Sequence, residues 1–382
     1  MTRILNVIRH PVGGIRSYLR YTYAALPPDE WTTTVLTIDV EEAHLMGAGL
    51  GAGSRLEFVA DRDATLRLGL SAMRELQSGQ YGLVHSQGTT AGIVAAPGAR
   101  MLGVPHVVTL HETFRPEQFA GWRGAVTRSA VRLMIDLADA VVVLGDDALA
   151  NLVEHVQVDD RALRKVHIIR NGVPVRWLIE EGARQRPELR RRLALPPDVA
   201  LLGFVGRFMP EKGFDLLVQA AHQLSQRGTA LPPFRIVAVN DGAYMREYRD
   251  LIASLGIAPL FSFVGLQPSA AGTLLELDAV VMPSRREACG LVAMEALVLG
   301  CPLIASNCFG LREVTAGTPA IEAANGDAGS LALAIERFLT HRGDVARQAS
   351  AFVDRARDAF EAANTARQMA DLFRQAGAPA AS

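Results

Sequence analysis

The stretch that decides the fold is Met282–Gly310, which reads MPSRREACGLVAMEALVLGCPLIASNCFG. A short apolar segment that ends at Pro283 predicts a buried strand, and a polar loop of small residues follows it. The run Gly290–Leu299 predicts a helix that ends at Gly300, and Pro302–Ala305 predicts a second strand. A strand, a helix and a further strand in this order indicate a parallel α/β sheet.

Two carboxylates mark this unit, Glu287 in the loop and Glu295 inside the predicted helix. If helical geometry extended over the whole interval, the rise alone would set the two residues about 12 Å apart. That distance is too long for two acids to share a proton, and longer than the carboxylate pair of a typical glycosidase. The spacing suits two separate binding contacts with one elongated ligand, one from each glutamate.

Strands and helices alternate on both sides of this stretch. Apolar strands are predicted at Thr33–Ile38 and Leu56–Val59, for example, and a helix at Ala64–Gln77. Such alternation predicts parallel, doubly wound sheets whose carboxyl ends bind ligands. The segment Val175–Asp198 is rich in Arg, Glu and Pro and holds no apolar strand, so it predicts a connection between two domains.

The domain prediction follows from these patterns and from a carboxyl-terminal segment that is helical in pattern. We expect an amino-terminal α/β domain over 1–174, a connection over 175–198, a second α/β domain over 199–345, and a terminal helix or helices over 346–382. The terminal helices are expected to pack back toward the first domain. The two sheets would face one another across a cleft.

The composition is that of an ordinary soluble protein, with 382 residues, 49% hydrophobic and 21% charged. A formal net charge of −1 gives no basic surface that would indicate a nucleic-acid partner. Three cysteines, Cys289, Cys301 and Cys308, are too few and too unpatterned for a disulfide framework and fit a reducing compartment. Without a signal-peptide pattern or a membrane-spanning run, the sequence predicts a cytoplasmic protein.

A peripheral contact with the inner face of a membrane is the alternative location. It would use Trp122, Arg123, Arg128 and Arg132, which lie among aliphatic residues of one predicted helix. On a helical projection Arg128 and Arg132 lie together, opposite much of the apolar stripe. A solvated face is the favoured explanation, and membrane contact is the alternative.

Two cations follow a predicted strand in FVGRFMPEKGFDLL. Arg207 comes just past the strand, and Lys212 comes five residues later, before a helix. Cations at the mouth of a parallel sheet can bind a diphosphate and stabilise it as it leaves. The alternative is an exposed pair bonded to solvent or to Glu211. Gly13 and Gly14 open a helix after the first strand, where free N–H groups and close approach suit an anion.

In combination, these pieces resemble the retaining, nucleotide-sugar-dependent glycosyltransferases of family 4. Those enzymes have the GT-B fold, in which two doubly wound, Rossmann-like domains face a central cleft. The matching segments run in the family's order to about Val314: PVGGIRSYL, VVTLHE, RNGVP, FVGRFMPEKGFDLLVQA, MPSRREACGLVAMEAL and GCPLIASNCFGLREV. Where the family has a Gly-Asp-Gly-Pro-like loop, this chain departs with VNDGAY, which contains Asn240 and Ala243.

The resemblance implies roles for residues on the nucleotide-sugar side. Arg207 and Lys212 would hold the diphosphate. Glu287 would bind hydroxyls of the transferred sugar, and Glu295 would bind the ribose, which agrees with two separate binding contacts with one ligand. Further N–H groups would come from the backbone at a helix amino terminus, at Ala288, Cys289, Gly290, Leu291 and Val292. The Cys289 side chain itself is interpreted as packing, since no base that would activate it is evident.

The resemblance also implies roles for residues of the first domain. His111 stands where the family carries a histidine that faces the reacting sugar; position alone favours a packed strand-end histidine, and the motif favours function. His85 ends the preceding strand, and there packing is favoured. Gly13 and Gly14 match the family's glycine loop near the phosphates and the acceptor.

The implied reaction is the transfer of a hexose-type sugar from a nucleoside diphosphate sugar to a carbohydrate, lipid-linked or small-molecule acceptor. Retention would follow from front-face attack, in which the departing phosphate helps to take the acceptor's proton. No cofactor or metal is expected, because the two cations would stabilise the diphosphate. The alternatives are a non-catalytic nucleotide-sugar-binding subunit and a sugar-nucleotide epimerase or phosphorylase of the same architecture. The sequence leaves open the base, the sugar, the acceptor, the linkage and the oligomeric state.

Overall fold

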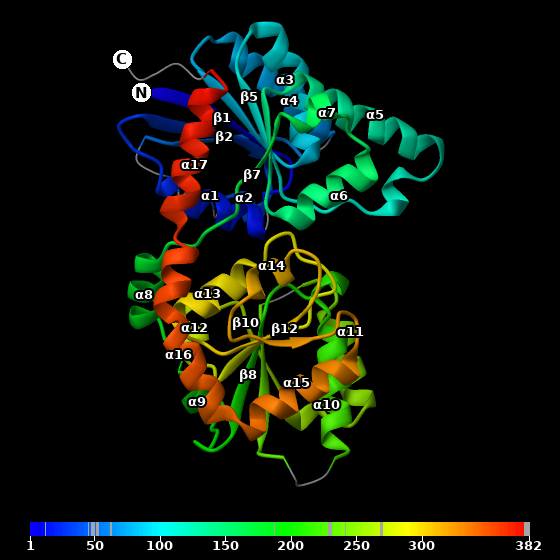
Figure 1. Cartoon of the computed structure of the whole chain (residues 1–382), viewed down its shortest axis with the longest axis vertical. Coiled ribbons are helices and arrows are strands. Elements are labelled where there is room, and N and C mark those ends of the chain that lie inside the picture. The colour runs from blue at the N-terminus through cyan, green and yellow to red at the C-terminus, as the bar shows by residue number, and fades with distance from the viewer. Residues whose placement is uncertain are drawn as a thin grey trace. The chain divides into compact units, whose positions relative to one another are not determined.

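The chain forms two compact units, which we refer to as unit 1 and unit 2 (Figure 1). The computed structural model describes residues 1–11, 13–44, 46, 50, 53–61, 63–186, 188–227, 231–240, 242–267 and 270–377. Unit 1 comprises Met1–Gly172 and the carboxyl-terminal segment that begins at Ala362, and unit 2 comprises Val173–Glu361.

Unit 1 is built on a parallel sheet with seven strands among its described residues, in the order β3-β2-β1-β4-β5-β6-β7. The order reverses between β1 and β4, which are neighbours in the sheet. In doubly wound sheets, ligands bind beyond the carboxyl ends of the strands at such a reversal. The strands are β1 (Thr2–Ile8), β2 (Trp31–Ile38), β3 (Arg55–Val59), β4 (Leu83–Gln87), β5 (His106–Leu110), β6 (Ala140–Val143) and β7 (Val166–Ile168).

Helices cover both faces of this sheet, as the alternation along β1 shows. Ile4 and Ile8 pack in one core cluster with α1 and α17, whereas Leu5 and Val7 pack in another with α3 and α4. Alternate strand residues point to opposite faces, so the two clusters lie on opposite sides of the sheet. The helices of unit 1 are α1 (Gly14–Ala24), α2 (Glu41–His44), α3 (Ala64–Gln77), α4 (Thr89–Leu102), α5 (Gly121–Leu137), α6 (Asp146–Val156), α7 (Asp160–Leu163) and α17 (Ala362–Gln375).

Unit 2 repeats this plan, with six parallel strands among its described residues in the order β10-β9-β8-β11-β12-β13. Its reversal lies between β8 and β11. The strands are β8 (Ala200–Val205), β9 (Phe234–Val239), β10 (Phe261–Gly265), β11 (Ala279–Met282), β12 (Leu303–Ser306) and β13 (Ile321–Ala323). The predicted fold class, a doubly wound α/β sheet in each of two Rossmann-like domains, is therefore confirmed.

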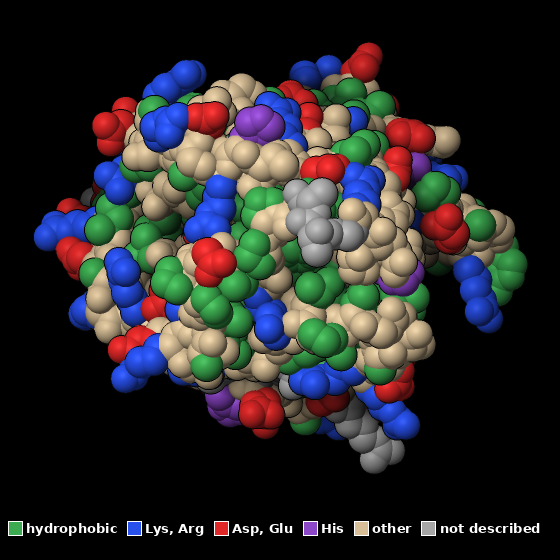
Figure 2. All heavy atoms as spheres, turned by 90° about the horizontal axis from the view of Figure 1, so that it is seen from below, with side chains coloured by type: hydrophobic (Ala, Val, Ile, Leu, Met, Phe, Trp, Pro, Cys, Tyr) green, Lys and Arg blue, Asp and Glu red, His purple; other side chains and the backbone are tan. Residues whose placement is uncertain are grey.

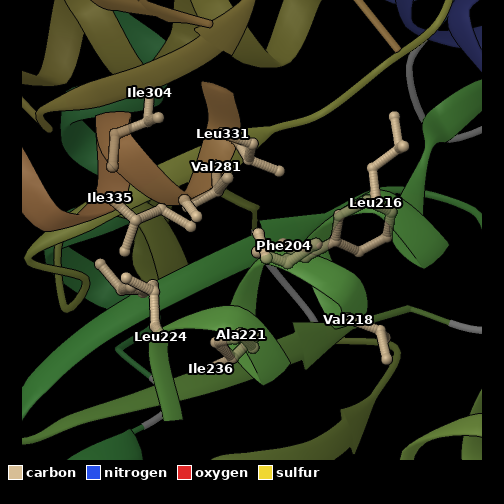
Figure 3. Close-up of a cluster of buried hydrophobic side chains, with 14 of the residues drawn as sticks. Phe204, Leu216, Val218, Ala221, Leu224, Ile236, Val281, Ile304, Leu331 and Ile335 are labelled. Carbon is tan, nitrogen blue, oxygen red and sulfur yellow. The ribbon is translucent and has the colours of Figure 1, made fainter. Parts of the chain in front are cut away.

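The core of unit 2 shows why its strands are apolar throughout. Strands β11 and β12 are buried along their whole length, because helices cover both faces of a parallel sheet. Figure 3 shows the cluster on one face, where Phe204, Val281 and Ile304 of the strands meet Leu216, Leu224, Leu331 and Ile335 of α10 and α15. The helices are α8 (Val175–Arg184), α9 (Leu189–Arg192), α10 (Phe214–Ser225), α11 (Met245–Ser254), α12 (Ala270–Leu274), α13 (Leu291–Leu299), α14 (Leu311–Thr315), α15 (Ala328–Thr340) and α16 (Arg342–Ala359).

The predicted connection over 175–198 is wrong, because this segment belongs to unit 2. It contains α8 and α9, and α8 contacts α12 and α13. Val175, Leu178 and Gly182 form the buried side of α8, at helical spacing, while its charged residues face outward. The many Arg and Glu residues hid this narrow apolar stripe in the sequence, so that the segment resembled a linker.

The terminal helices divide between the two units. Helix α16 belongs to unit 2, and α17 belongs to unit 1, where it contacts α1. Phe373 of α17 is fully buried with its ring centroid 5.5 Å from that of Trp31. Within unit 2, the Val173 N–H donates to the Phe360 carbonyl at 2.7 Å, which joins the two points where that unit begins and ends.

Helix α5 gives two of its arginines a local structural role. Arg128 Nε donates to the His155 carbonyl at 3.0 Å, and Arg132 Nε donates to the Val156 carbonyl at 2.9 Å. These carbonyls end α6, so the two cations satisfy backbone acceptors that the helix leaves open. Trp122, at the start of α5, is 74% exposed, and the Arg123 guanidinium lies over its ring.

The face of the molecule in Figure 2 is mixed in charge. On the face in Figure 2, Lys and Arg side chains lie among Asp and Glu side chains, and the described residues there form no continuous field of one sign. In the described part of the chain, every helix is too short or too polar to cross a membrane.

Candidate active site

The candidate site of unit 2 lies where the strand order reverses. Strands β8 and β11 are parallel neighbours, and their carboxyl ends lie at the same edge of the sheet. The loop 206–213 follows β8 and carries Arg207 and Lys212, and the loop 283–290 follows β11 and carries Glu287. The topology thus brings together residues that lie 75 positions apart in the sequence.

Lys212 and Glu287 form the central contact of the site. Lys212 Nζ donates to both carboxylate oxygens of Glu287, each at 2.7 Å. The Glu287 side chain is only 8% exposed and that of Lys212 is 29% exposed. The buried Ser284 hydroxyl also donates to Glu287 Oε1 at 2.7 Å. A cation and a hydroxyl thus compensate a carboxylate that would otherwise be costly to bury.

A second ion pair fixes the two loops against each other. Arg285, two residues before Glu287, donates through two nitrogens to the two carboxylate oxygens of Asp215 on α10, at 2.7 and 2.6 Å. Arg285 Nη1 also donates to the Pro210 carbonyl at 3.0 Å, and its backbone N–H donates to the Glu211 carbonyl at 2.8 Å. The bidentate geometry restricts both partners. The loop with Glu287 is therefore held on the loop with Lys212.

Two glycines allow close backbone approaches at this sheet edge, Gly213 in the loop after β8 and Gly310 in the loop after β12. Gly213 has a φ of 66°, and a Cβ there would lie 2.0 Å from the Pro283 carbonyl oxygen. Gly310 has a φ of 75°, and a Cβ there would lie 2.3 Å from the Glu287 carbonyl oxygen. Both positions need a left-handed backbone and the space of a missing side chain.

Helix α13 places the second glutamate. It begins at Leu291, after Gly290 in a left-handed conformation, and Glu295 is buried in its second turn. Glu287 therefore lies outside the helix, and the estimate of 12 Å from helical rise does not apply to this pair. The amino-terminal N–H groups at Leu291 and Val292 have no acceptor within the helix. Cys289 is buried, as its interpretation as a packing residue requires, and Ala288 lies in the same loop.

Arg207 is the exposed cation of the site. It lies just beyond β8, and among the described residues its guanidinium has no hydrogen-bond or ion-pair partner. Lys212 is paired with Glu287, whereas the exposed Arg207 guanidinium is accessible to an anion. The alternative of a Lys212 bonded only to solvent or to Glu211 does not describe the structure.

The remaining predicted residues lie in unit 1. Gly13 precedes α1 with φ 56° and ψ −126°, a conformation that requires glycine, and Gly14 is the first residue of that helix. His111 follows β5, and its Nε2 lies 2.7 Å from Gln87 Oε1 at the end of β4. The His111 ring is half-buried and lies edge-on to Tyr18 of α1, with ring centroids 4.7 Å apart.

Buried histidines in unit 1 are held neutral. Burial lowers the pKa of His106 to about 3, and the pKa of His111 also to about 3, from the ordinary 6.5. Burial lowers the pKa of His85 well below 6.5, and the nearby His111 and His106 lower it further. A neutral imidazole has one N–H and one acceptor nitrogen, so the hydrogen bonds of each ring decide its tautomer.

The departure at Asn240 concerns a backbone position. Asn240 follows β9 with a φ of 99°, and its N–H donates to the Gly265 carbonyl at 2.9 Å. Positive φ favours glycine, and asparagine is among the residues that tolerate it best. Asparagine thus replaces the family's glycine at a position with a glycine-like backbone. Ala243, the second departure, lies in an exposed turn.

Sequence reasoning missed four residues that shape these sites. Ser284, Arg285 and Asp215 hold the Glu287 loop, and Gln87 contacts His111. Asp215 and Arg285 are 70 positions apart, and each stands in a segment full of other polar residues. Only the adjacency of β8 and β11 pairs them. A metal site is a different matter: the described residues contain no cluster of three or more His, Cys, Asp or Glu side chains that could hold an ion.

Solved structures with this fold include GT-B glycosyltransferases. The chain's fold matches Anabaena HepE in complex with UDP, with a TM-score of 0.80 at 19% identity, over 98% of this chain and 100% of that chain. It also matches sucrose-phosphate synthase from Thermosynechococcus elongatus, with a TM-score of 0.79 at 22% identity, over 98% and 99% of the two chains. At these identities the likeness establishes the fold.

The family follows from sequence. A family model described as Glycosyltransferase Family 4 matches residues 12–177, and one described as Glycosyl transferases group 1 matches residues 185–358. The chain is 31% identical over 314 residues to a D-inositol 3-phosphate glycosyltransferase of Thermomonospora curvata, which covers 77% of this chain and 70% of that protein. It is 28% identical over 267 residues to a 2-deoxystreptamine glucosyltransferase of Streptomyces kanamyceticus, with 67% of each covered. The chain belongs to the family-4 glycosyltransferases (glycosyl transferases group 1).

The Lys212–Glu287 contact predicts non-additive stability effects. Lys212→Met leaves a buried carboxylate without its cation and should lower the free energy of unfolding by about 2–3 kcal/mol, less than for a fully buried pair. Adding Glu287→Gln should restore part of this loss, because the uncompensated charge is then gone. Urea unfolding of the wild type, both single variants and the double variant measures the coupling. Strictly additive losses would show that the two side chains do not stabilise each other.

The buried histidines predict that stability falls in mild acid. His85 and His106 titrate near 6.5 when unfolded but lower when folded, so below pH 6.5 the unfolded chain binds more protons. Their contribution is complete above about pH 6.5 and falls by up to about 1.4 kcal/mol per pH unit for each histidine as the pH drops toward 5. Urea midpoints from pH 7.5 to 5 measure this slope, which His106→Asn should reduce. The exposed His44→Asn is the control; equal slopes in all three proteins would contradict the prediction.

Proposed function

We propose that this glycosyltransferase moves a hexose-type sugar from a nucleoside diphosphate sugar to an acceptor, with retention of configuration. The observation that carries the proposal is the Lys212–Glu287 contact at the strand reversal of unit 2, with the free Arg207 beside it in the sequence. A buried carboxylate binds sugar hydroxyls, and cations bind phosphates, so one contact joins the two chemistries of such a donor.

In this proposal, charge stabilisation supplies most of the catalysis. Arg207 and Lys212 bind the diphosphate and stabilise the negative charge that develops as it leaves. The amino terminus of α13 adds backbone N–H groups from the segment Ala288–Val292. Glu295 binds the ribose, and Glu287 binds the transferred sugar. The proposed site needs no metal or other cofactor, since its cations and helix terminus face the diphosphate.

The acceptor's attack completes the proposed reaction. The acceptor hydroxyl attacks the anomeric carbon from the face that the diphosphate leaves, and a departing phosphate oxygen takes the hydroxyl proton. The bond to the diphosphate breaks as the new glycosidic bond forms. His111, with Gly13 and Gly14, contributes to the sugar and acceptor side of this reaction.

Similar proteins support the donor class and suggest acceptors to test. Anabaena HepE has been solved in complex with UDP-glucose, and it has the same fold as this chain with a TM-score of 0.79 at 20% identity. The relatives in Thermomonospora curvata and Streptomyces kanamyceticus are named for D-inositol 3-phosphate and 2-deoxystreptamine. Both names denote hydroxylated six-membered carbocycles. We therefore include such rings among the small-molecule acceptors of this chain.

A donor screen tests the proposed function. Purified protein is offered UDP-glucose, GDP-mannose and UDP-N-acetylglucosamine, and free nucleoside diphosphate is measured with and without D-inositol 3-phosphate, 2-deoxystreptamine and saccharide pools. We expect one donor to release its nucleotide faster when an acceptor is present, without added metal and with EDTA. Binding of no donor would overturn the proposal. Tight binding without transfer to any acceptor would favour a non-catalytic binding subunit.

The role of Glu287 gives a sharper prediction. Glu287→Gln keeps the shape of the side chain but removes its charge, so it should reduce transfer at least about 100-fold through weaker hydrogen bonds to the sugar. Binding of the nucleoside diphosphate alone should not weaken, because that ligand lacks the sugar and Lys212 loses only a competing anion. Calorimetry and initial rates measure the two effects, with the exposed Glu57→Gln as the matched control. Wild-type turnover in Glu287→Gln would remove Glu287 from its proposed role.

A further inference from the structure

A chain of hydrogen bonds crosses the interior of unit 1 and ends at His111. It begins at the Ile4 backbone carbonyl, which accepts from the Thr33 hydroxyl at 3.4 Å. Asn6 Nδ2 then donates to Thr33 Oγ1 at 2.5 Å. Gln87 Nε2 donates to Asn6 Oδ1 at 2.9 Å, and Gln87 Oε1 lies 2.7 Å from His111 Nε2. Asn6 and Gln87 are buried, on β1 and β4, at the strand reversal of unit 1.

The polarity of this chain follows from its first member. A backbone carbonyl only accepts, so the Thr33 hydroxyl donates its one proton to the Ile4 carbonyl. Its oxygen must therefore accept the hydrogen bond from Asn6. The Asn6 oxygen then faces Gln87, where a reversed Gln87 amide would set two oxygens against each other at 2.9 Å. The Tyr23 hydroxyl donates to the same Asn6 oxygen at 2.9 Å, which holds it in place. The Gln87 oxygen is therefore the atom that faces His111.

The tautomer of His111 follows in turn. The Gln87 oxygen can only accept, so His111 Nε2 carries the proton. Burial keeps the ring neutral by lowering its pKa to about 3, so Nδ1 carries a lone pair. Among the described residues, Nδ1 has no hydrogen-bond partner. The chain of donors thus ends in an acceptor that a ligand can use.

We propose that Gln87 is a positioning residue, which fixes His111 as the Nε2–H tautomer so that Nδ1 accepts a hydrogen bond from a hydroxyl of the transferred sugar. This inference rests on the proposed function for the identity of the ligand, but not for the tautomer. It assigns a specificity: the recognised group on the sugar must donate a hydrogen bond. Burying a chain of polar groups costs more free energy than an apolar core unless every member is hydrogen-bonded. We therefore assign the order of its hydrogen bonds a role beyond packing.

Histidine NMR tests the tautomer without any substrate. Long-range proton–nitrogen correlation on protein labelled with [15N]histidine, at pH 7.5, distinguishes the two neutral tautomers and the imidazolium, and His111→Asn assigns the signal. We expect the Nε2–H form in the wild type and a mixture of tautomers in Gln87→Met. An Nδ1–H tautomer or an imidazolium in the wild type would overturn the proposal, and so would an unchanged tautomer in Gln87→Met.

The pH profile of transfer tests the use of Nδ1. Among the described residues, the titratable groups around His111 are Tyr18 on α1, His85 on β4 and Glu112 beside it. In Gln87→Glu, a carboxylate replaces the neutral amide at 2.7 Å from Nε2 and favours the imidazolium, which has no lone pair at Nδ1. Its kcat should therefore fall toward acid between pH 8 and 6, whereas wild-type kcat shows no such histidine step.

Two comparisons separate positioning from structural support. Gln87→Met should lower kcat at least about 10-fold at every pH, with the KM for the nucleotide sugar nearly unchanged. Gln77→Glu, the same change at an exposed helix end, should keep the wild-type profile. An equal, pH-independent loss in Gln87→Met and Gln87→Glu would assign Gln87 a purely structural role. If no donor were used, the proposed function would fail, while the NMR result would still decide the tautomer.

Discussion

The contact of Lys212 with Glu287 is the constraint around which the candidate site of unit 2 is arranged. A carboxylate that is 8% exposed must meet compensating charge, and Lys212 supplies it with two bonds of 2.7 Å. To do so, the loops after β8 and β11 must nearly touch. The close backbone approach at Gly213 permits this, and the bidentate Arg285–Asp215 pair holds it. The need to pair these buried polar and charged groups thus determines which conformations the loops at this sheet edge can have.

Among its described residues, unit 1 meets the same requirement at its own strand reversal without buried charges. Its interior polar groups there are amides, hydroxyls and imidazoles, and burial keeps His85 and His111 neutral. A chain of neutral groups carries no charge, but it has a defined donor-to-acceptor order, because each hydrogen bond fixes which atom of the next group donates. Under the proposed function, this difference between the two strand reversals matches the ligand. The charged residues at the reversal of unit 2 bind the diphosphate, and the neutral residues at the reversal of unit 1 accept a hydrogen bond from a sugar hydroxyl.

The sequence predicted those parts of the fold that depend on local periodicity. Helix α3 has its predicted bounds, Ala64–Gln77, and α13 begins one residue after the predicted start. The helix α8 escaped detection because three buried positions in ten residues give a weak pattern among so many charges. Arg285, Asp215 and Gln87 could not be found, since their partners are set by strand adjacency, which the sequence does not display. The resemblance implied site roles for Lys212 and Glu287, but not that the two side chains bind each other.

That mutual contact has a consequence for the proposed chemistry. With Lys212 already compensated by Glu287, the free positive charge that meets a diphosphate is that of Arg207 and the α13 amino terminus. In the proposed site, Lys212 would then bridge the phosphate and Glu287, the residue proposed to bind the sugar. A change in how Glu287 holds the sugar hydroxyls is thereby felt at the leaving phosphate, because both compete for the same ammonium protons. Sugar recognition and leaving-group stabilisation would be coupled through a single nitrogen, so that the correct sugar improves the departure of its own diphosphate.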